Sequence, residues 1–423
     1  MTRMKDSGIE WIGEVPEEWG ITKLKYICGM QSGNNLTSLE ISSENDGGKI
    51  FPVYGDNGQR GYYSDFTNEG NYCLVGRQGA LAGNIHFVSG KFWATDHAIV
   101  VYEHAHTYSK YLYYLLKVMN LNQYAFETSA QPGLSVEKIL QLETIHCPKG
   151  EQSQITDFLD KKVAQLDKVK SLLEEQIKTL EDYRQSLIYE TVTKGLDKTV
   201  PLKDSGVDWI GQIPEGWGIT KFKYFLDTNK GLTITKQNLI EDGIPVINYG
   251  QIHSKYGRSV STVRDELPQV STNYLKFKQP LLNKGDFVFA DTSEDIEGSG
   301  NFSTRIDDDG ELFAGYHTIK ATLKTTLEHD FRYFMHYFDS MAFRKQVQTK
   351  VSGIKVYSVT QSILQETCLL LPSFIEQQRI ANFLNKKTEQ INQMIAIKKE
   401  QIENINKQRQ TLIYDYVTGK RRV

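Results

Sequence analysis

The chain has 423 residues, 39% of them hydrophobic and 11% aromatic, which is typical of a globular protein large enough for two or more domains. Its formal net charge of −3 excludes nucleic-acid binding through overall basicity, so such a surface would have to gather its basic residues on one face. No apolar run approaches the ~18 residues of a membrane helix, and the four cysteines form no CxxC pair. We therefore expect a cytoplasmic protein without a disulfide framework or structural zinc.

The most informative pattern is a repeat. Residues 5–26 read KDSGIEWIGEVPEEWGITKLKY and residues 203–224 read KDSGVDWIGQIPEGWGITKFKY, identical at 16 of 22 positions. We call these two stretches the opening segments. A second repeated pair is EQSQITDFLDKK from Glu151 and EQQRIANFLNKK from Glu376. The first pair is offset by 198 residues (5 to 203) and the second by 225 (151 to 376), so the duplicated halves differ by 27 residues between these flanks.

Each half is predicted to be a mixed head followed by a long helix, in the order head 1–148, helix 149–195, head 196–372 and helix 373–423. Short β-like runs and one helix mark each head. In head one the strands are expected at 72–75, 85–88 and 98–102 and the helix at 109–119; in head two the strands are expected at 287–289 and 318–321 and the helix at 331–341.

The two long helices each carry an apolar seam with alternating spacings of four and three, the heptad pattern of a coiled coil. The seam residues are Leu159, Leu166, Leu173, Ile177, Leu180 and Leu187 in the first helix and Leu384, Ile391, Ile395, Ile402, Ile405 and Leu412 in the second. Arg184 and Arg409 interrupt the seams at equivalent places. Each arginine either extends out of the seam to water or fixes the register of the pair.

The simplest arrangement pairs these helices with each other as an antiparallel coiled coil. The fold class is then α+β, with two similar mixed α/β heads separated by two paired helices around an approximate two-fold axis. By this symmetry the second helix ends near the start of head one, so the arrangement is nearly circular and the chain termini are adjacent.

The sequence lacks the motifs of the common catalytic and metal sites. It contains no GxxxxGK[ST], no Glu-x-Lys, no HExxH and no GxSxG, and no two prolines are adjacent. We therefore predict no catalytic residue, no metal site and no cofactor in this chain.

Polar side chains on glycine-rich loops are the candidates for ligand contact in head one. Arginine pairs with guanine and asparagine or glutamine with adenine, while glycines let the backbone approach phosphates. The candidates are Tyr54, Asn57, Gln59, Arg60, Arg77, Gln78, His97 and Gln131. Such loops also occur in proteins that bind nothing charged.

The corresponding candidates in head two are Asn248, Tyr249, Gln251, Lys255, Arg258, Ser293, His317 and Lys355. His97 and His317 align, and each is either a hydrogen-bonded histidine at the start of a strand or a contact to a base or phosphate. Ser135 and Ser358 are both expected to cap short helices.

The chain resembles the specificity subunits of type I restriction–modification systems along its whole length. The resemblance is carried by WIGEVPEEW and WIGQIPEGW, by the Glu151-Gln152 and Glu376-Gln377 starts of the long helices, by the helix ends SLIY and TLIY, and by the GRQGxxxGNIHFV run of head one. Head two has Ala290-Asp291-Thr292-Ser293 in place of GRQG, so contacts cannot be transferred between the heads.

This resemblance implies that each head is a target-recognition domain that reads half of a split DNA site. The helices would set the gap between half-sites and carry two methylation subunits, which methylate adenine, and nuclease/translocase subunits would complete the complex. S-adenosylmethionine, ATP and Mg²⁺ are expected in the partner subunits, and this subunit would perform no chemistry. Two alternatives are a stand-alone enzyme and a coiled-coil scaffold whose heads bind a ligand other than DNA.

Overall fold

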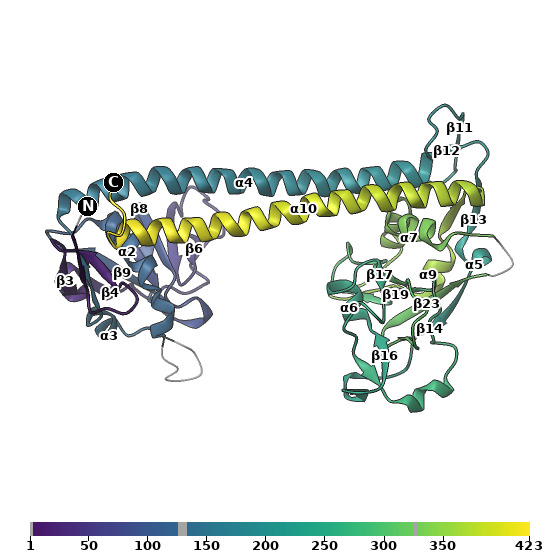
Figure 1. Cartoon of the computed structure of the whole chain (residues 1–423), viewed down its shortest axis with the longest axis horizontal. Coiled ribbons are helices and arrows are strands. Elements are labelled where there is room, and N and C mark those ends of the chain that lie inside the picture. The colour runs from purple at the N-terminus through teal and green to yellow at the C-terminus, as the bar shows by residue number, and fades with distance from the viewer. Residues whose placement is uncertain (1–2, 126–132, 325–327) are drawn as a thin grey trace. The chain divides into compact units, whose positions relative to one another are not determined.

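The structure is a computed structural model that describes residues 3–125, 133–324 and 328–423. It divides into two compact units, residues 1–174 with 398–423 and residues 175–397. Each unit contains one head and segments of both long helices, α4 (Lys149–Lys194) and α10 (Phe374–Val417). In the first unit lie both ends of the chain (Figure 1).

Head one is built around a six-stranded sheet with the order β4-β9-β7-β8-β5-β6, and two two-stranded sheets, β1-β2 and β3-β10, complete it. Its strands are β1 (Met4–Asp6), β2 (Glu14–Pro16), β3 (Gly20–Lys23), β4 (Cys28–Ser32), β5 (Phe51–Gly55), β6 (Gly58–Tyr63), β7 (Asn68–Gly76), β8 (Ile85–Ala94), β9 (Ala98–Glu103) and β10 (Glu143–His146). Its helices are α1 (Leu24–Ile27), α2 (Ser109–Met119) and α3 (Val136–Leu140). Helix α2 packs on β7 and β8, where Tyr113 meets Phe87 edge to face.

Head two repeats this plan with its sheet divided into β14-β23-β19-β21-β17 and β15-β18-β16-β22. Its strands are β11 (Leu202–Asp204), β12 (Gln212–Pro214), β13 (Gly218–Lys221), β14 (Leu226–Lys230), β15 (Leu239–Ile240), β16 (Ile244–Ile247), β17 (Ser259–Val260), β18 (Gln269–Val270), β19 (Phe287–Ala290), β20 (Thr292–Ser293), β21 (Phe302–Arg305), β22 (Phe313–Ala314), β23 (Thr318–Leu323), β24 (Tyr357–Ser358) and β25 (Cys368–Leu371). Its helices are α5 (Phe222–Phe225), α6 (Tyr249–Ser254), α7 (Phe331–Asp339), α8 (Met341–Gln348) and α9 (Gln361–Gln365). The strands and helices predicted for both heads are present, although the helix expected at 331–341 ends at Asp339.

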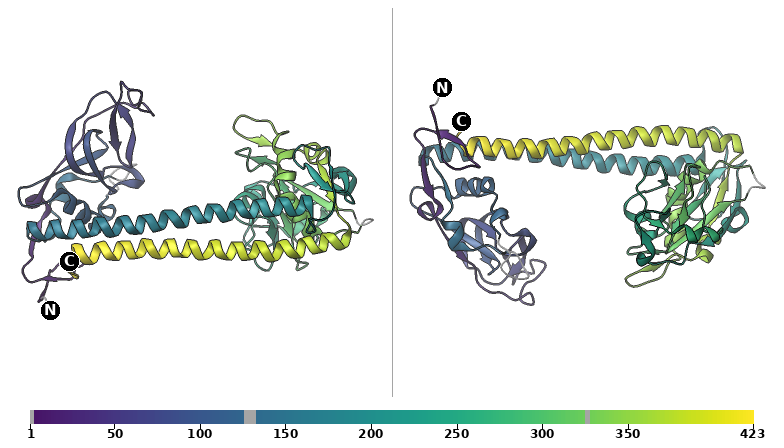
Figure 2. Two further views of the ribbon diagram at one scale, coloured as in Figure 1. Left: turned by 90° about the horizontal axis from the view of Figure 1, so that it is seen from above. Right: turned by 60° about the horizontal axis from the view of Figure 1, so that its bottom comes forward.

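The register of the long helices follows the predicted seam. Every seam residue is buried or half-buried, whereas most side chains between them are exposed. In the first unit Phe158 contacts Tyr416 and Asp167 pairs with Arg409, so the two helices run antiparallel there. In the second unit Arg184 donates to Asn392 Oδ1 at 2.6 Å. The helix segments lie side by side in each unit (Figure 2).

These polar contacts decide between the two interpretations of the seam arginines. Arg184 and Arg409 occupy the same place in the repeat, and so do their partners Asn392 and Asp167, at the offset of 225. Each arginine therefore reaches across to the other helix, which favours a role in fixing the register over simple extension into water.

The repeated residues make the same hydrogen bonds twice, from the opening segment to the start of the following helix. The indole N–H of Trp19 donates to Glu151 Oε2 at 3.1 Å, and that of Trp217 donates to Glu376 Oε2 at 3.0 Å. Burial raises the pKa of Glu376, and the indole bond opposes this by favouring the carboxylate. The repeat thus encodes a fixed junction between each head and the helix that follows it.

A second duplicated contact ties each opening segment to the end of the other helix. In the first unit the Tyr414 hydroxyl reaches the carbonyl oxygens of Trp11 and Ile12 at 3.0 and 3.1 Å. In the second unit the Tyr189 hydroxyl donates to the Ile210 carbonyl at 3.2 Å. The end of α10 therefore lies against the start of head one, as the predicted near-circular arrangement requires.

One predicted cap is wrong. Ser135 caps α3 by accepting from the Lys138 N–H, as expected, but Ser358 lies in β24. The cap of the corresponding helix α9 is Thr360, whose hydroxyl accepts from the Ile363 N–H at 3.2 Å. The counterpart of Ser135 in the repeat is therefore Thr360 and not Ser358, which lies two residues earlier; threonine caps by the same bond as serine.

Candidate nucleic-acid interface

Both heads contain a tight turn that presents a histidine between two strands. In head one the turn joins β8 to β9 and carries His97; in head two it joins β22 to β23 and carries His317. The glycine that follows the edge strand of each head, Gly33 after β4 and Gly231 after β14, fits against the turn. A Cβ added to Gly33 would lie 2.2 Å from the Ala94 carbonyl oxygen, and one added to Gly231 would lie 2.0 Å from the Gly315 carbonyl oxygen. Only glycine permits this close approach, so both turns are held by the same packing.

The sheet register places residues of opposite charge beside these two turns. β7 pairs with β9 in head one as β19 pairs with β23 in head two, so Arg77 and Asp291 follow corresponding strand ends. The Arg77 N–H donates to the His97 carbonyl at 2.9 Å, and the Asp291 N–H donates to the His317 carbonyl at 3.1 Å. This backbone hydrogen bond is thus shared by both heads, although His317 but not His97 has a positive φ, while the side chain changes from a donor to an acceptor.

In head one an aspartate that the sequence analysis did not select brings several candidates together. Asp56, in the turn between β5 and β6, accepts from the Gln78 N–H at 3.2 Å and lies 3.5 Å from His97 Nδ1. The Arg77 guanidinium donates to the Asp96 carbonyl at 3.4 Å. Arg77, Gln78 and His97 therefore form one cluster around the hairpin turn.

The remaining candidates of head one surround this turn. Asn57, Gln59 and Arg60 are exposed on the hairpin, and half-buried Tyr54 meets Phe92 edge to face. Burial raises the pKa of Tyr54, so its hydroxyl stays protonated. Gln131 lies outside the described residues.

His86 was also missed by the sequence analysis. A Cβ at Gly58 would lie 3.2 Å from its ring, so the imidazole backs the hairpin turn. Burial, together with the charge of Lys117, lowers the pKa of His86 and keeps it neutral. Its role is to support the turn that carries Asn57.

In head two an aromatic group surrounds the histidine turn. The Tyr249 ring lies 5.3 Å from that of His317 and 5.8 Å from that of Tyr316. His317 has a φ of 54°, in the left-handed region that non-glycine residues rarely adopt, and its Nδ1 lies 3.1 Å from Asp291 Oδ1. The exposed imidazole is therefore fixed by both backbone and side chain.

Two amides predicted to contact a ligand bond to each other at the start of a helix. Asn248 is fully buried at the N-terminus of α6, and it forms a reciprocal capping box with Gln251. Its Oδ1 also accepts from the Tyr316 N–H at 3.1 Å. Direct contact by Asn248 is corrected to a positioning role, because a side chain without exposed surface cannot reach a base.

Three further candidates of head two are committed to internal contacts. Arg258 donates to His336 Nδ1 at 3.1 Å and lies 3.4 Å from Asp339 Oδ2, Lys255 donates to the Glu266 carbonyl, and Ser293 is buried. Lys355 is exposed in the segment before β24. Of the predicted set in this head, Lys255, His317 and Lys355 are exposed, and Tyr249, Gln251 and Arg258 are half-buried.

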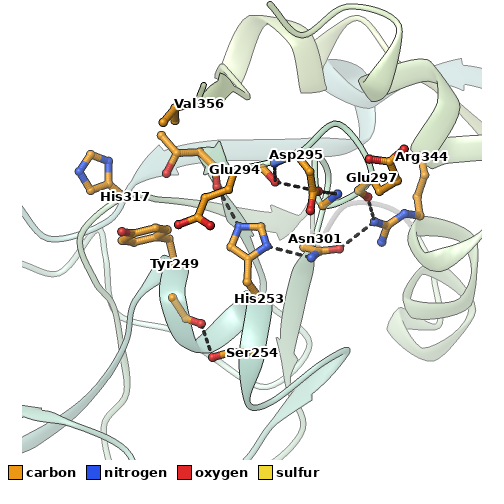
Figure 3. A pocket seen from close by; sticks show the side chains of 14 residues that line it. Tyr249, His253, Ser254, Glu294, Asp295, Glu297, Asn301, His317, Arg344 and Val356 are labelled. Atoms are coloured by element: carbon orange, nitrogen blue, oxygen red, sulfur yellow. Dashed lines mark hydrogen bonds between the residues drawn. The ribbon is translucent and has the colours of Figure 1, made fainter. Parts of the chain in front are cut away.

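A pocket of about 780 Å³ opens beside Tyr249 and His317, and its polar wall was not predicted (Figure 3). Asn301 Nδ2 donates to His253 Nδ1 at 2.9 Å, so the other ring nitrogen carries the proton and donates to the Thr292 carbonyl at 2.8 Å. Arg344 in turn donates to Asn301 Oδ1 at 2.8 Å. The wall is therefore a preorganised chain with a neutral imidazole.

The rim of this pocket carries Glu294, Asp295 and Glu297, all exposed. These carboxylates accept hydrogen bonds and repel phosphates, so the pocket suits a donor-bearing group better than an anion. Burial lowers the pKa of Arg344, which remains a cation at neutral pH.

Among the residues that the structure describes, no group of three or more histidine, cysteine, aspartate or glutamate side chains could hold a metal ion. Nor does any helix in that part of the chain have the length and apolarity to cross a membrane.

The model of the type I restriction modification DNA specificity domain matches residues 16–181 and 214–406. The chain belongs to this family. Two matched domains correspond to the duplicated halves, and the protein is a type I specificity subunit with two target-recognition domains.

Individual relatives agree with this assignment. The type I restriction enzyme EcoprrI specificity subunit of Escherichia coli is 38% identical over 138 residues, a third of this chain and 34% of that subunit. The MjaVIII specificity subunit of Methanocaldococcus jannaschii is 24% identical over 97% of this chain and 94% of its own length. A solved chain from work on complex assembly and conformational transition of the type I R-M system has a TM-score of 0.68 at 14% identity, over 96% of this chain and 99% of that one, which shows the shared fold.

Proposed function

We propose that the two heads of this specificity subunit read the two halves of a split, asymmetric DNA target through the surfaces around His97 and His317. The observation that carries the proposal is the pair Arg77 and Asp291. The same strand pairing and backbone hydrogen bond occur in both heads, with a hydrogen-bond donor side chain in head one and an acceptor in head two. Guanine offers acceptors in the major groove and cytosine and adenine offer amino donors, so the heads are suited to different bases.

In head one the exposed side chains Asn57, Gln59 and Arg60 extend this surface, with Arg77, Gln78 and His97 at its centre. In head two Tyr249, His317 and Lys355 are the corresponding contacts, and the acidic rim of the pocket accepts from base amino groups. Because the chain has a net charge of −3, phosphate contacts are expected to come largely from partner subunits.

In this proposal the subunit carries out no chemistry itself. It assembles with two methylation subunits that use S-adenosylmethionine to methylate adenine, and with nuclease/translocase subunits that use ATP and Mg²⁺. It acts in the cytoplasm, in agreement with the four unpaired cysteines.

The test is to reconstitute the full chain with its methylation subunits and map methylated adenines on random-sequence DNA. A single two-part motif with a fixed gap is the expected result. Methylation without sequence preference, or no methylation with an assembled complex, would refute the proposal.

A further inference from the structure

A short exposed surface carries the same isoleucine and tyrosine in both heads. It lies where β3 turns into α1 in head one and β13 into α5 in head two, and we call it the β3–α1 corner. Tyr26 and Tyr224 are 66% and 64% exposed, and Ile21 and Ile219 are 40% and 38% exposed. Two large apolar side chains thus face water at matched positions of both copies.

Exposure alone does not preserve residues in the opening segments. Glu14 corresponds to Gln212 and Glu18 to Gly216, and all four positions are exposed. The repeat has therefore changed at some exposed positions, while the isoleucine and tyrosine of the corner are identical in both copies, as are the exposed Glu17 and Glu215.

Internal contacts explain the neighbouring lysines but not these apolar residues. Lys25 donates to Gln141 Oε1 at 3.2 Å, and Lys223 pairs with the corresponding Glu366. Neither the Tyr26 nor the Tyr224 hydroxyl has a hydrogen-bond partner within the described part of the chain, and each ring contacts only the preceding lysine in the cation–π contacts found there. These contacts within the head therefore do not account for the presence of a tyrosine at both positions.

The corner lies away from the histidine turn. Tyr26 precedes β4, whose far end leads to Gly33 against the Ala94 carbonyl, and Tyr224 precedes β14, which leads to Gly231 in the same way. A five-residue strand spans roughly 17 Å. The corner and the proposed DNA surface are thus at opposite ends of the sheet, which favours a protein over DNA as the partner.

We propose that the β3–α1 corner of each head is a docking surface for one protein partner, bound in two equivalent copies through an apolar contact centred on Tyr26 and Tyr224. Matched apolar residues on heads that differ elsewhere favour the same partner at both, and tyrosine is enriched in binding hot spots. The lysines do not set the contact, because Glu366 neutralises them in head two but Gln141 does not in head one. This inference rests on the proposed function, in which the partner is the methylation subunit.

The experiment titrates the methylation subunit into the full chain and its variants Tyr26→Ala, Tyr224→Ala and the double variant, with stoichiometry read by native mass spectrometry and affinity by calorimetry. Each single variant should keep one wild-type site and weaken the other by roughly 30-fold, and the double variant should weaken both. Ile21→Ser should reproduce the effect of Tyr26→Ala, and unchanged melting curves show that the variants fold.

The control is Leu39→Ala, since Leu39 is 95% exposed in head one but corresponds to Gln237, a polar residue. It should bind two copies at wild-type affinity. Two wild-type sites in the double variant would overturn the inference, and so would a loss of DNA affinity at unchanged stoichiometry. Failure of the wild-type chain itself to bind the methylation subunit would instead refute the proposed function.

Discussion

At the strand end beside each histidine turn, the chain carries an arginine in one copy and an aspartate in the other. The backbone hydrogen bonds at Arg77 and Asp291 are alike, while the two side chains have opposite charge. If these side chains contact DNA as proposed, single substitutions at the two positions should change the target without disturbing the fold.

The first prediction follows from this pair. Arg77→Gln should relax preference at one base pair of the head-one half-site by about 1–3 kcal/mol, because a bidentate contact to guanine is lost. Asp291→Asn should change only the head-two half-site. Methylation mapping measures both, and the unchanged half-site is the internal control. If either variant altered both half-sites or neither, the assignment would be wrong.

A buried histidine supplies a second prediction at this scale. His336 accepts from Arg258 through Nδ1 and donates to Asn385 Oδ1 through Nε2, so it is neutral. Burial, with the nearby Arg258 charge, lowers its pKa to about 3. The unfolded chain takes up this proton below its ordinary pKa near 6.5 while the folded chain does not, so acid favours unfolding.

The free energy of unfolding of head two should therefore fall by about 1 kcal/mol for each pH unit between pH 6 and pH 4, because of His336. His336→Gln should flatten that part of the profile, as followed by urea unfolding. His104→Gln, an exposed substitution in head one, serves as the control. Parallel profiles for the wild type and His336→Gln would contradict the prediction.

Among the secondary-structure elements, the C-terminal end of each long helix is joined to an opening segment by a repeated hydrogen bond. The Tyr414 and Tyr189 hydroxyls bind carbonyl groups of the two opening segments. A hydrogen bond of this kind contributes about 1 kcal/mol, and a buried carbonyl left without it costs more.

Tyr414→Phe and Tyr189→Phe should therefore each destabilise the protein by about 1 kcal/mol. Thermal unfolding of each variant measures this. Tyr183→Phe is the matched control, because Tyr183 lies on α4 but is exposed. If Tyr183→Phe lowered the melting temperature as much as Tyr189→Phe, loss of the hydrogen bond to the carbonyl would not explain the destabilisation.

Features of this scale could be predicted from the sequence where they depend on residues close together in the chain. The seams have a period of three and four residues, so both long helices and their pairing were readable. The pocket wall joins His253, Asn301 and Arg344, which are brought together only by the fold. Asn248 was misread because an amide that caps a helix and one that contacts a base look alike in sequence.

At the scale of the whole chain, each long helix begins in one compact unit and ends in the other. Helix α4 has 46 residues and α10 has 44, or about 69 and 66 Å at 1.5 Å per residue. If these helices set the gap between half-sites, shortening both in register should shorten the gap.

Deleting residues 170–176 together with 400–406 removes one heptad from each helix at facing positions, since Asp167 pairs with Arg409 and Arg184 with Asn392. The loss of about 10 Å corresponds to roughly three base pairs, so methylation mapping should find both half-sites unchanged but about three base pairs closer. Deleting only four residues from each helix is the control, because it moves the seam off its heptad and should disrupt pairing rather than shift the gap. An unchanged gap in a folded, active heptad-deletion variant would mean that the spacing is set by the heads or by partner subunits, and the helices would then serve assembly alone.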